Sequence, residues 1–357
     1  MLSTDYAINR FDINCSPFDI DKPSVSSKIF IEQSPQINEM LATFDLTPAQ
    51  MLAISKQLEF FHPKTKSQLF SLCFEHSGAQ LQNMSQQIDP VFTWEDLILE
   101  EKLKTEIKQA CAFVKHKNTV YNDWGLGKRI SYGRGLNILF TGPPGTGKTM
   151  LAQVIANELS LKLFRVDLSA ISSKYIGETE ENLAEIFNQA EKTNCILFFD
   201  EMDSLFGKRG DVQSSNDKYA NMETSYILQR LEQYNGVVLM ATNYLSNIDE
   251  AFMRRIHFIF HIPLPNQKLR LQLWYSSFPA VAPLEKDIDF EFLSRKFEIS
   301  GSSIKNIAVS AAFFAAQQNS AISMQHIIKA LSLELSKQGK LFLPESLEQY
   351  RYMGELK

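Results

Sequence analysis

The sequence predicts an α/β fold in which a parallel sheet is flanked by helices and is followed by a small all-helical unit. Three observations support this prediction. Short apolar segments alternate with helical patterns from about residue 92 onward, a glycine-rich stretch joins one of these segments to a helix, and no strand pattern returns after Pro265. Alternation of strands and helices is typical of parallel sheets with right-handed crossover connections.

Five segments have the length and apolar content of buried strands. They are Leu136–Phe140, Leu163–Val166, Ile196–Phe199, Val237–Met240 and Phe258–Ile262. Helical patterns follow them over residues 267–277, 288–297, 301–318 and 323–338. We therefore expect a parallel five-stranded sheet with flanking helices and a C-terminal helical lid.

The front of the chain differs from the rest in charge and composition. Residues 1–90 hold 6 Lys and Arg against 10 Asp and Glu. Thr47 and Gln50 form a capping-box pattern around a Pro in the first turn, which predicts a helix from that point. A second helix is expected over 66–76, and the Gln/Asn/Ser-rich stretch from Gly78 to Pro90 predicts a linker.

These patterns divide the chain into three parts. Residues 1–90 form a small, mainly helical N-terminal region that we expect to receive a substrate or adaptor, 91–265 form a large α/β domain, and 266–357 form the small helical lid domain. With 357 residues and 44% hydrophobic content, the chain is long enough for these cores.

Composition also excludes several classes of protein. No stretch approaches the roughly 18 apolar residues of a spanning helix, and the first residues lack a secretory pattern, so we expect a cytoplasmic protein with no membrane partner. The four cysteines form no CxxC pair, which favours apolar packing over a disulfide framework or a zinc site. The net charge of -5 argues against nucleic acid as a partner.

The most specific motif follows the first predicted strand directly and opens a helix. It fits the phosphate-binding pattern GxxxxGK[ST], in which backbone N–H groups surround a phosphate and the lysine reaches the β- and γ-phosphates. The threonine hydroxyl is a ligand for Mg²⁺ in this arrangement. The motif consists of Gly142, Pro143, Pro144, Gly145, Thr146, Gly147, Lys148 and Thr149.

Polar residues also end two other predicted strands. Asp200 and Glu201 follow the apolar run Ile196–Phe199, and Asn243 follows Val237–Met240. At the carboxyl end of a strand beside a phosphate loop, Asp200 is expected to hold Mg²⁺ and Glu201 to polarise the attacking water. Asn243 either positions that water or caps the following turn.

Together these residues resemble the AAA+ ATPases, in particular the clade typified by protein-remodelling enzymes. The resemblance covers about residues 91–340 and implies a P-loop NTPase module that binds ATP and Mg²⁺. In its terms 142–149 are similar to Walker A, 196–201 to Walker B and Asn243 to sensor 1. Residues 92–97 are similar to the entry segment of this family, which lies near the base of the nucleotide.

The resemblance also assigns roles to three further segments. Tyr175, Ile176 and Gly177 resemble the first pore loop, which points into the channel of a hexamer. Arg254 and Arg255 resemble the arginine fingers that complete a neighbouring subunit's site; they are adjacent here rather than three residues apart, and we favour Arg254. Gly301 fits the small-residue lid contact of this clade, which makes Lys305 a weak candidate for a nucleotide sensor.

The resemblance therefore implies a homo-oligomer, expected to be a hexamer, that hydrolyses ATP and remodels or threads a protein substrate. Several stretches, among them Val120–Gly125 and Ser300–Asn306, are more similar still to ATPases associated with bacterial contractile injection systems. Two alternatives remain open at this stage: a nucleotide-gated scaffold or regulator without threading, and a motor of the same fold that acts on nucleic acid.

Overall fold

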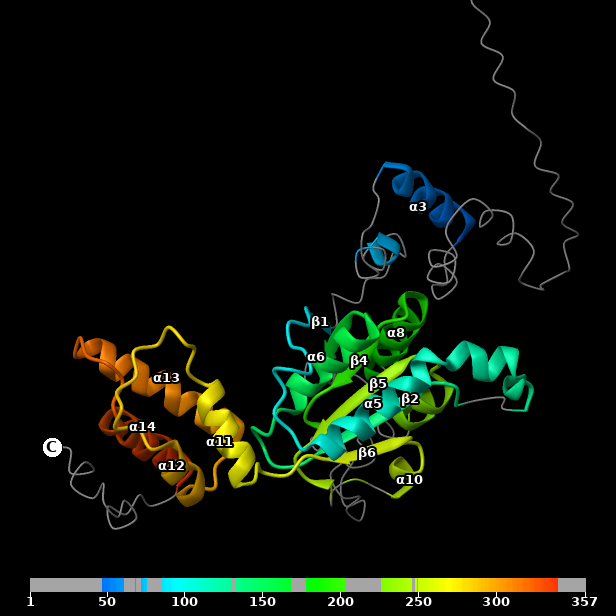
Figure 1. Cartoon of the computed structure of the whole chain (residues 1–357). Helices are drawn as coiled ribbons and strands as arrows, with labels where there is room; N and C mark the ends of the chain where they lie inside the picture. The colour runs from blue at the N-terminus through cyan, green and yellow to red at the C-terminus, as the bar shows by residue number, and fades with distance from the viewer. Residues whose placement is uncertain are drawn as a thin grey trace, which may run out of the picture.

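The computed structural model describes residues 47–60, 68, 72–75, 85–129, 133–167, 178–202, 226–245, 248 and 250–339. Within these residues an α/β unit with a central sheet lies beside a group of helices (Figure 1). The elements of the α/β unit are β1 (Ser85–Ile88), α5 (Glu101–Lys115), η3 (Thr119–Asp123), η4 (Leu126–Lys128), β2 (Leu136–Thr141), α6 (Lys148–Leu159), β3 (Leu163–Val166), α8 (Glu178–Thr193), β4 (Ile196–Phe199), β5 (Val237–Thr242), α10 (Glu250–Met253) and β6 (Phe258–His261). Helix α3 (Pro48–Phe60) precedes them, and α11 (Gln267–Ser276), α12 (Phe290–Lys296), α13 (Gly301–Gln317) and α14 (Met324–Lys337) follow.

The sheet has six strands in the order β1-β3-β4-β5-β2-β6. Its five strands β2 to β6 are parallel where they pair. The bounds of each strand differ by at most two residues from those of a segment that the sequence predicts as a strand. The α/β fold and the helical C-terminal region are therefore confirmed. Strand β1 is additional and pairs antiparallel with β3, from Ser85 opposite Val166 to Ile88 opposite Leu163.

Strand β1 corrects the prediction of a linker from Gly78 to Pro90. Its sequence, SQQI, has no apolar run, because an edge strand has only one neighbouring strand and its side chains are only partly covered. The pattern that identifies buried strands does not detect such a segment. The sheet thus begins before residue 91, where the sequence places the start of the large domain.

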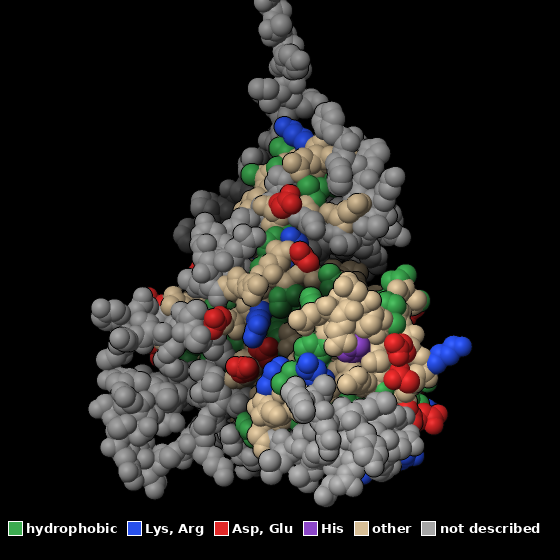
Figure 2. Space-filling model, turned by 90° about the vertical axis from the view of Figure 1, so that its left-hand side faces the viewer, with side chains coloured by type: hydrophobic (Ala, Val, Ile, Leu, Met, Phe, Trp, Pro, Cys, Tyr) green, Lys and Arg blue, Asp and Glu red, His purple; other side chains and the backbone are tan. Residues whose placement is uncertain are grey.

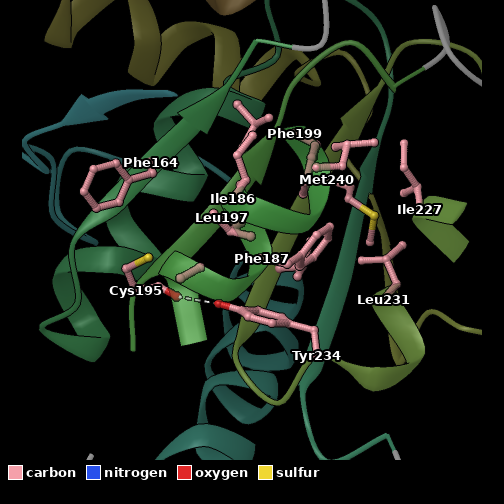
Figure 3. Close-up of a cluster of buried hydrophobic side chains, with 14 of the residues drawn as sticks. Phe164, Ile186, Phe187, Cys195, Leu197, Phe199, Ile227, Leu231, Tyr234 and Met240 are labelled. Atoms are coloured by element: carbon pink, nitrogen blue, oxygen red, sulfur yellow. Dashed lines mark hydrogen bonds between the residues drawn. The ribbon is translucent and has the colours of Figure 1, made fainter. Parts of the chain in front are cut away.

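Both faces of the sheet are covered, which explains the unbroken apolar runs of its strands. Alternate residues of β3, β4 and β5 point to opposite sides and join two separate buried clusters. Helix α8 and residues 226–233 contribute to one cluster, and α5 and α6 contribute to the other. Figure 3 shows the first cluster, where the Tyr234 hydroxyl donates to the Cys195 carbonyl oxygen at 3.3 Å.

The four C-terminal helices bury their own apolar cluster around Trp274 and Phe290. All four lie within the ranges that the sequence predicts. Asn266 caps α11 by accepting a hydrogen bond from the Leu269 N–H group at 3.0 Å. The buried Arg270 side chain donates to the carbonyl oxygens of Ser294 and Pro265 at 2.8 and 2.7 Å, so its charge is satisfied inside this unit.

The described part of the N-terminal region is attached to the sheet rather than separate from it. The predicted capping box of α3 is confirmed, since Thr47 and Gln50 exchange backbone and side-chain hydrogen bonds at 2.8 and 3.3 Å. Phe74 stacks on Phe164 of β3 with ring centroids 5.4 Å apart, and the Lys162 ammonium lies 4.1 Å from the Phe74 ring centroid. Apolar contact therefore ties this region to the edge of the sheet beside β1.

Three of the four cysteines confirm the prediction of apolar packing. Cys73, Cys111 and Cys195 are buried free thiols, and burial raises their pKa values to about 11, 12 and 12. Cys15 lies outside the described residues.

Among the helices that the structure describes, none is long and apolar enough to cross a bilayer.

Residues 92–97 are hydrogen-bonded to α6, the helix that follows the glycine-rich loop. The Trp94 Nε1–H group donates to Glu158 Oε2 at 2.9 Å, and Asn157 Nδ2 donates to the Phe92 carbonyl oxygen at 3.1 Å. Lys115 forms an ion pair with the same Glu158 carboxylate. The hydrogen bonds from Lys115 and Trp94 lower the pKa of Glu158 from its usual value of 4.5.

We predict that Glu158→Gln lowers the free energy of unfolding by about 1 kcal/mol at pH 7. The interactions that lower this pKa stabilise the folded protein above pH 4.5. Their contribution is lost as the pH falls through the pKa that Glu158 has in the folded state. The loss caused by the substitution should therefore shrink toward pH 4. Urea unfolding at both pH values measures it. The control is Glu106→Gln, which removes an exposed pair with Lys102 of 4.0 Å and should change stability by only a few tenths of a kcal/mol; equal losses at both pH values would contradict the assignment.

Candidate functional site

The glycine-rich loop lies between the end of β2 and the start of α6, as the sequence predicts. Gly142, Gly145 and Gly147 have φ angles of 140°, 76° and 97°, which residues other than glycine rarely adopt. Gly142 is further restricted by its surroundings, because a Cβ atom there would lie 2.1 Å from the Ile262 carbonyl oxygen. The backbone of the loop therefore has the turns that bring N–H groups around an anion at the start of a helix.

Lys148 connects this loop to the end of β5. Its ammonium donates to the carbonyl oxygens of Gly142 and Pro143 at 2.8 and 2.9 Å, and to Asn243 Oδ1 at 2.9 Å. Lys148 is only 8% exposed, so these acceptors replace the water that its charge would otherwise need. Lys148 and Asn243, predicted separately from two motifs, thus lie in direct contact.

Thr149 and Asp200 form a second contact at the same edge of the sheet. The Thr149 hydroxyl donates to Asp200 Oδ2 at 3.2 Å, and the Glu201 N–H group donates to Asp200 Oδ1 at 3.1 Å. A hydroxyl and a carboxylate oxygen side by side are the hard oxygen donors that Mg²⁺ prefers, so these two residues fit that ion. Glu201 is exposed and has a φ angle of 55°, an uncommon conformation for a residue with a side chain.

The sequence analysis missed one charged residue of this site, Arg165. One guanidinium nitrogen of Arg165, Nη2, lies 3.3 Å from Asp200 Oδ2. Arg165 belongs to β3, which is otherwise made of Leu, Phe and Val. A single charged residue near the carboxyl end of a buried apolar strand is a signal that could have identified it.

The lid contacts the glycine-rich loop at the start of α13. The Ser302 N–H group donates to the Gly145 carbonyl oxygen at 3.1 Å, and the same oxygen lies 3.8 Å from the position of a Cβ atom on Gly301. The small residues of 300–303 therefore allow the helix start to approach the loop closely. Lys305 is exposed on the next turn of α13.

The two candidate finger arginines have different surroundings. Arg255 is paired within its own chain, since its Nε atom lies 2.6 Å from Glu232 Oε1. Arg254 is exposed. Both lie just before β6, and the carbonyl oxygen of Arg255 accepts a hydrogen bond at 3.1 Å from the side chain of Asn137, near the start of β2. They are thus at the opposite edge of the sheet from the glycine-rich loop.

Tyr175, Ile176 and Gly177 lie outside the described residues, so their predicted position in a pore loop stays a prediction. Within the described ranges no group of three or more His, Cys, Asp or Glu side chains has the arrangement of a metal site. Thr149 and Asp200 supply two oxygen donors, which fits an ion that takes its remaining ligands from phosphate and water, as is typical of Mg²⁺.

Comparison with known proteins agrees with this geometry. Residues 138–264 match the family described as "ATPase family associated with various cellular activities (AAA)". These residues form an AAA ATPase domain. It includes the glycine-rich loop, Asp200, Glu201, Asn243 and both candidate finger arginines.

Two relatives are named "Proteasome-activating nucleotidase". The protein from Saccharolobus islandicus is 29% identical over 262 residues, which cover 71% of this chain and 65% of the relative. The protein from Aeropyrum pernix is 36% identical over 203 residues, which cover 54% of this chain and 49% of the relative. The chain therefore spans less than two thirds of the length of either relative that it matches.

We predict that Gly145→Ala in the AAA domain lowers the free energy of unfolding by about 2 kcal/mol. A Cβ atom there would lie 2.0 Å from Ser302 Oγ and 2.7 Å from Ser300 Oγ, in addition to the strain of a φ angle of 76°. Chemical denaturation without nucleotide measures the change.

The matched control is Gly125→Ala, which has a φ angle of 74° but nothing within 4 Å of the added Cβ atom. It should lose only the backbone contribution of about 1 kcal/mol. Equal losses in both variants would contradict the prediction and show that the Ser300 and Ser302 hydroxyls move away from an added Cβ atom without cost.

Proposed function

We propose that this protein binds and hydrolyses ATP with Mg²⁺. The observation that carries the proposal is the convergence of two contacts at one edge of the sheet, Lys148 with Asn243 and Thr149 with Asp200. Each contact joins a residue after one strand to a residue after another, and together they surround the start of α6. This is the position at which AAA ATPase domains are expected to hold the phosphates.

Each residue then has a role that follows from its chemistry. The backbone N–H groups of the glycine-rich loop, which Pro143 and Pro144 lack, bind the phosphates. The Lys148 ammonium also binds them and exchanges its present carbonyl acceptors for phosphate oxygens. Glu201 orients and polarises the attacking water, and Asn243 fixes its position. Mg²⁺ at Thr149 and Asp200 would neutralise phosphate charge during the reaction.

We propose Arg254 as the finger that acts on a neighbouring subunit. The two arginines lie near the amino end of β2, and the glycine-rich loop follows its carboxyl end. A strand of this length separates the two edges by about 20 Å, so Arg254 is too far to reach the phosphates of its own chain. ATP hydrolysis therefore requires a ring, which we take to be a hexamer.

The proposed consequence of hydrolysis is remodelling or threading of a protein substrate in the cytoplasm, with Tyr175, Ile176 and Gly177 gripping the chain. Both relatives are named proteasome-activating nucleotidases, which supports this class of activity. The more specific link to contractile injection systems rests on sequence segments such as Val120–Gly125 alone. On the face seen in Figure 2, positive and negative side chains are interspersed over the described residues, which disfavours a nucleic-acid substrate.

We predict that Glu201→Gln keeps ATP binding and lowers the turnover rate about 100-fold, because only the polarisation of water is lost. Lys148→Ala should weaken ATP binding about tenfold or more, because charge-assisted hydrogen bonds to phosphate are removed. Binding of a fluorescent ATP analogue and release of inorganic phosphate measure the two effects. Lys329→Ala in the lid, whose ammonium lies 5.0 Å from the Phe314 ring centroid, is the control and should change neither. Unchanged turnover in Glu201→Gln would overturn the assignment of the site.

We predict that Arg254→Ala abolishes ATP hydrolysis in a ring made of this variant alone. Mixing it with Glu201→Gln subunits should restore part of the activity, since an intact Glu201 then meets an intact Arg254 from its neighbour. Phosphate release from the mixture measures the rescue. Arg255→Ala should instead destabilise its own chain by removing the ion pair with Glu232. Failure of the rescue in rings shown to contain both subunits would contradict action between subunits.

A further inference from the structure

The carboxylate of Asp200 has a defined partner on each oxygen. Oδ1 accepts from the Glu201 N–H group at 3.1 Å. Oδ2 accepts from the Thr149 hydroxyl at 3.2 Å and lies 3.3 Å from Arg165 Nη2. These partners come from the start of α6, from β3 and from the residue after Asp200, so the carboxylate is fixed from three directions.

Arg165 contacts the carboxylate that would hold Mg²⁺. Arginine keeps its positive charge at every pH at which a protein is folded, and its guanidinium binds carboxylates as a directional donor. The Thr149 and Asp200 pair is also the proposed position of Mg²⁺, so the two positive groups would repel each other and compete for the Asp200 carboxylate. The Arg165 side chain is 42% exposed, which leaves its long stem room to withdraw.

We infer that Arg165 is a positioning residue that holds the Asp200 carboxylate and sets how strongly the site depends on Mg²⁺. This inference rests on the proposed function, because it assumes that nucleotide and Mg²⁺ bind at this edge. Without Mg²⁺, Arg165 offsets the negative charge of Asp200, which would otherwise repel a phosphate in the glycine-rich loop. With Mg²⁺ bound, Arg165 would oppose the ion through its own charge.

The two effects of removing Arg165 therefore have opposite signs. Arg165→Gln should weaken binding of nucleotide in the absence of Mg²⁺ by about threefold, because the charge of Asp200 is no longer offset. It should also lower the Mg²⁺ concentration for half-saturation by about threefold, because the competing positive charge is gone. If Arg165 had only a structural role, its removal would weaken the binding of both nucleotide and Mg²⁺, since a distorted site binds both ligands less well.

The experiment uses the full chain and a fluorescent ADP analogue. Its affinity is measured first with excess EDTA and then in a Mg²⁺ titration at a fixed nucleotide concentration, for the unmodified protein, Arg165→Gln and Arg165→Lys. Lysine keeps the charge but lacks the planar fork, so Arg165→Lys should shift both values in the same directions by less. If Arg165→Gln does not fold, as judged by thermal unfolding, Arg165→Lys against the unmodified protein carries the test.

The matched control is Lys115→Gln, which also removes one partner of a carboxylate, Glu158. Glu158 is ten residues beyond Lys148 on α6, about 15 Å along the helix, so neither binding constant should change. Unchanged constants in Arg165→Gln, or a weakening of both, would overturn the inference while leaving the ATP site in place. Absence of nucleotide binding in the unmodified protein would overturn the proposed function and this inference with it.

Discussion

The register of the parallel strands is the constraint on which the rest of the site depends. Thr141 of β2 is opposite Thr242 of β5, so the residues that follow them, Gly142 and Asn243, leave the sheet side by side. Phe199 of β4 is opposite Met240 of β5, which places Asp200 one step further along the same edge. A shift of one residue in either pairing would move every side chain of that strand to the other face and separate the polar groups from one another.

Two positive and two negative side chains meet at this edge, and their arrangement limits the energetic penalty of burial. Lys148 is nearly buried but has three oxygen acceptors, and Asp200 is held by a backbone amide, a hydroxyl and a guanidinium. Because Lys148 and Asp200 each have several partners, their side chains are oriented before a ligand arrives, which reduces the reorganisation that ligand binding requires. Glu201 differs in that it is exposed, which is compatible with its proposed action on water.

The sequence predicted the parallel strands and the lid helices closely because both are defined by patterns of apolar residues. The glycine-rich loop, Asp200 and Asn243 were predictable because parallel strands with short connections bring their carboxyl ends together. Strand β1 was not, since its polar sequence carries no pattern and its position is set by pairing with β3. The contact between Arg165 and Asp200 was also missed, because it joins two strands through side chains and no spacing along the chain encodes it. The sequence alone favoured Arg254 over Arg255, and the ion pair of Arg255 with Glu232 adds a support for that proposal which no spacing along the chain encodes.

Gly142 also determines how closely the glycine-rich loop approaches the segment that leads into the lid. Its backbone passes against the carbonyl of Ile262, and the Ile262 N–H group donates to the Thr141 carbonyl oxygen at 2.7 Å. Ile262 is the first residue after β6, and the four residues that follow it lead directly into α11 of the lid. The glycine-rich loop therefore contacts the segment that connects β6 to the lid, so a change in the backbone of the loop would have to be accommodated by that segment. The second contact, from Ser302 to Gly145, gives the lid a second point of support. Both contacts involve main-chain atoms of the loop, so they link the loop to the lid independently of exposed side chains.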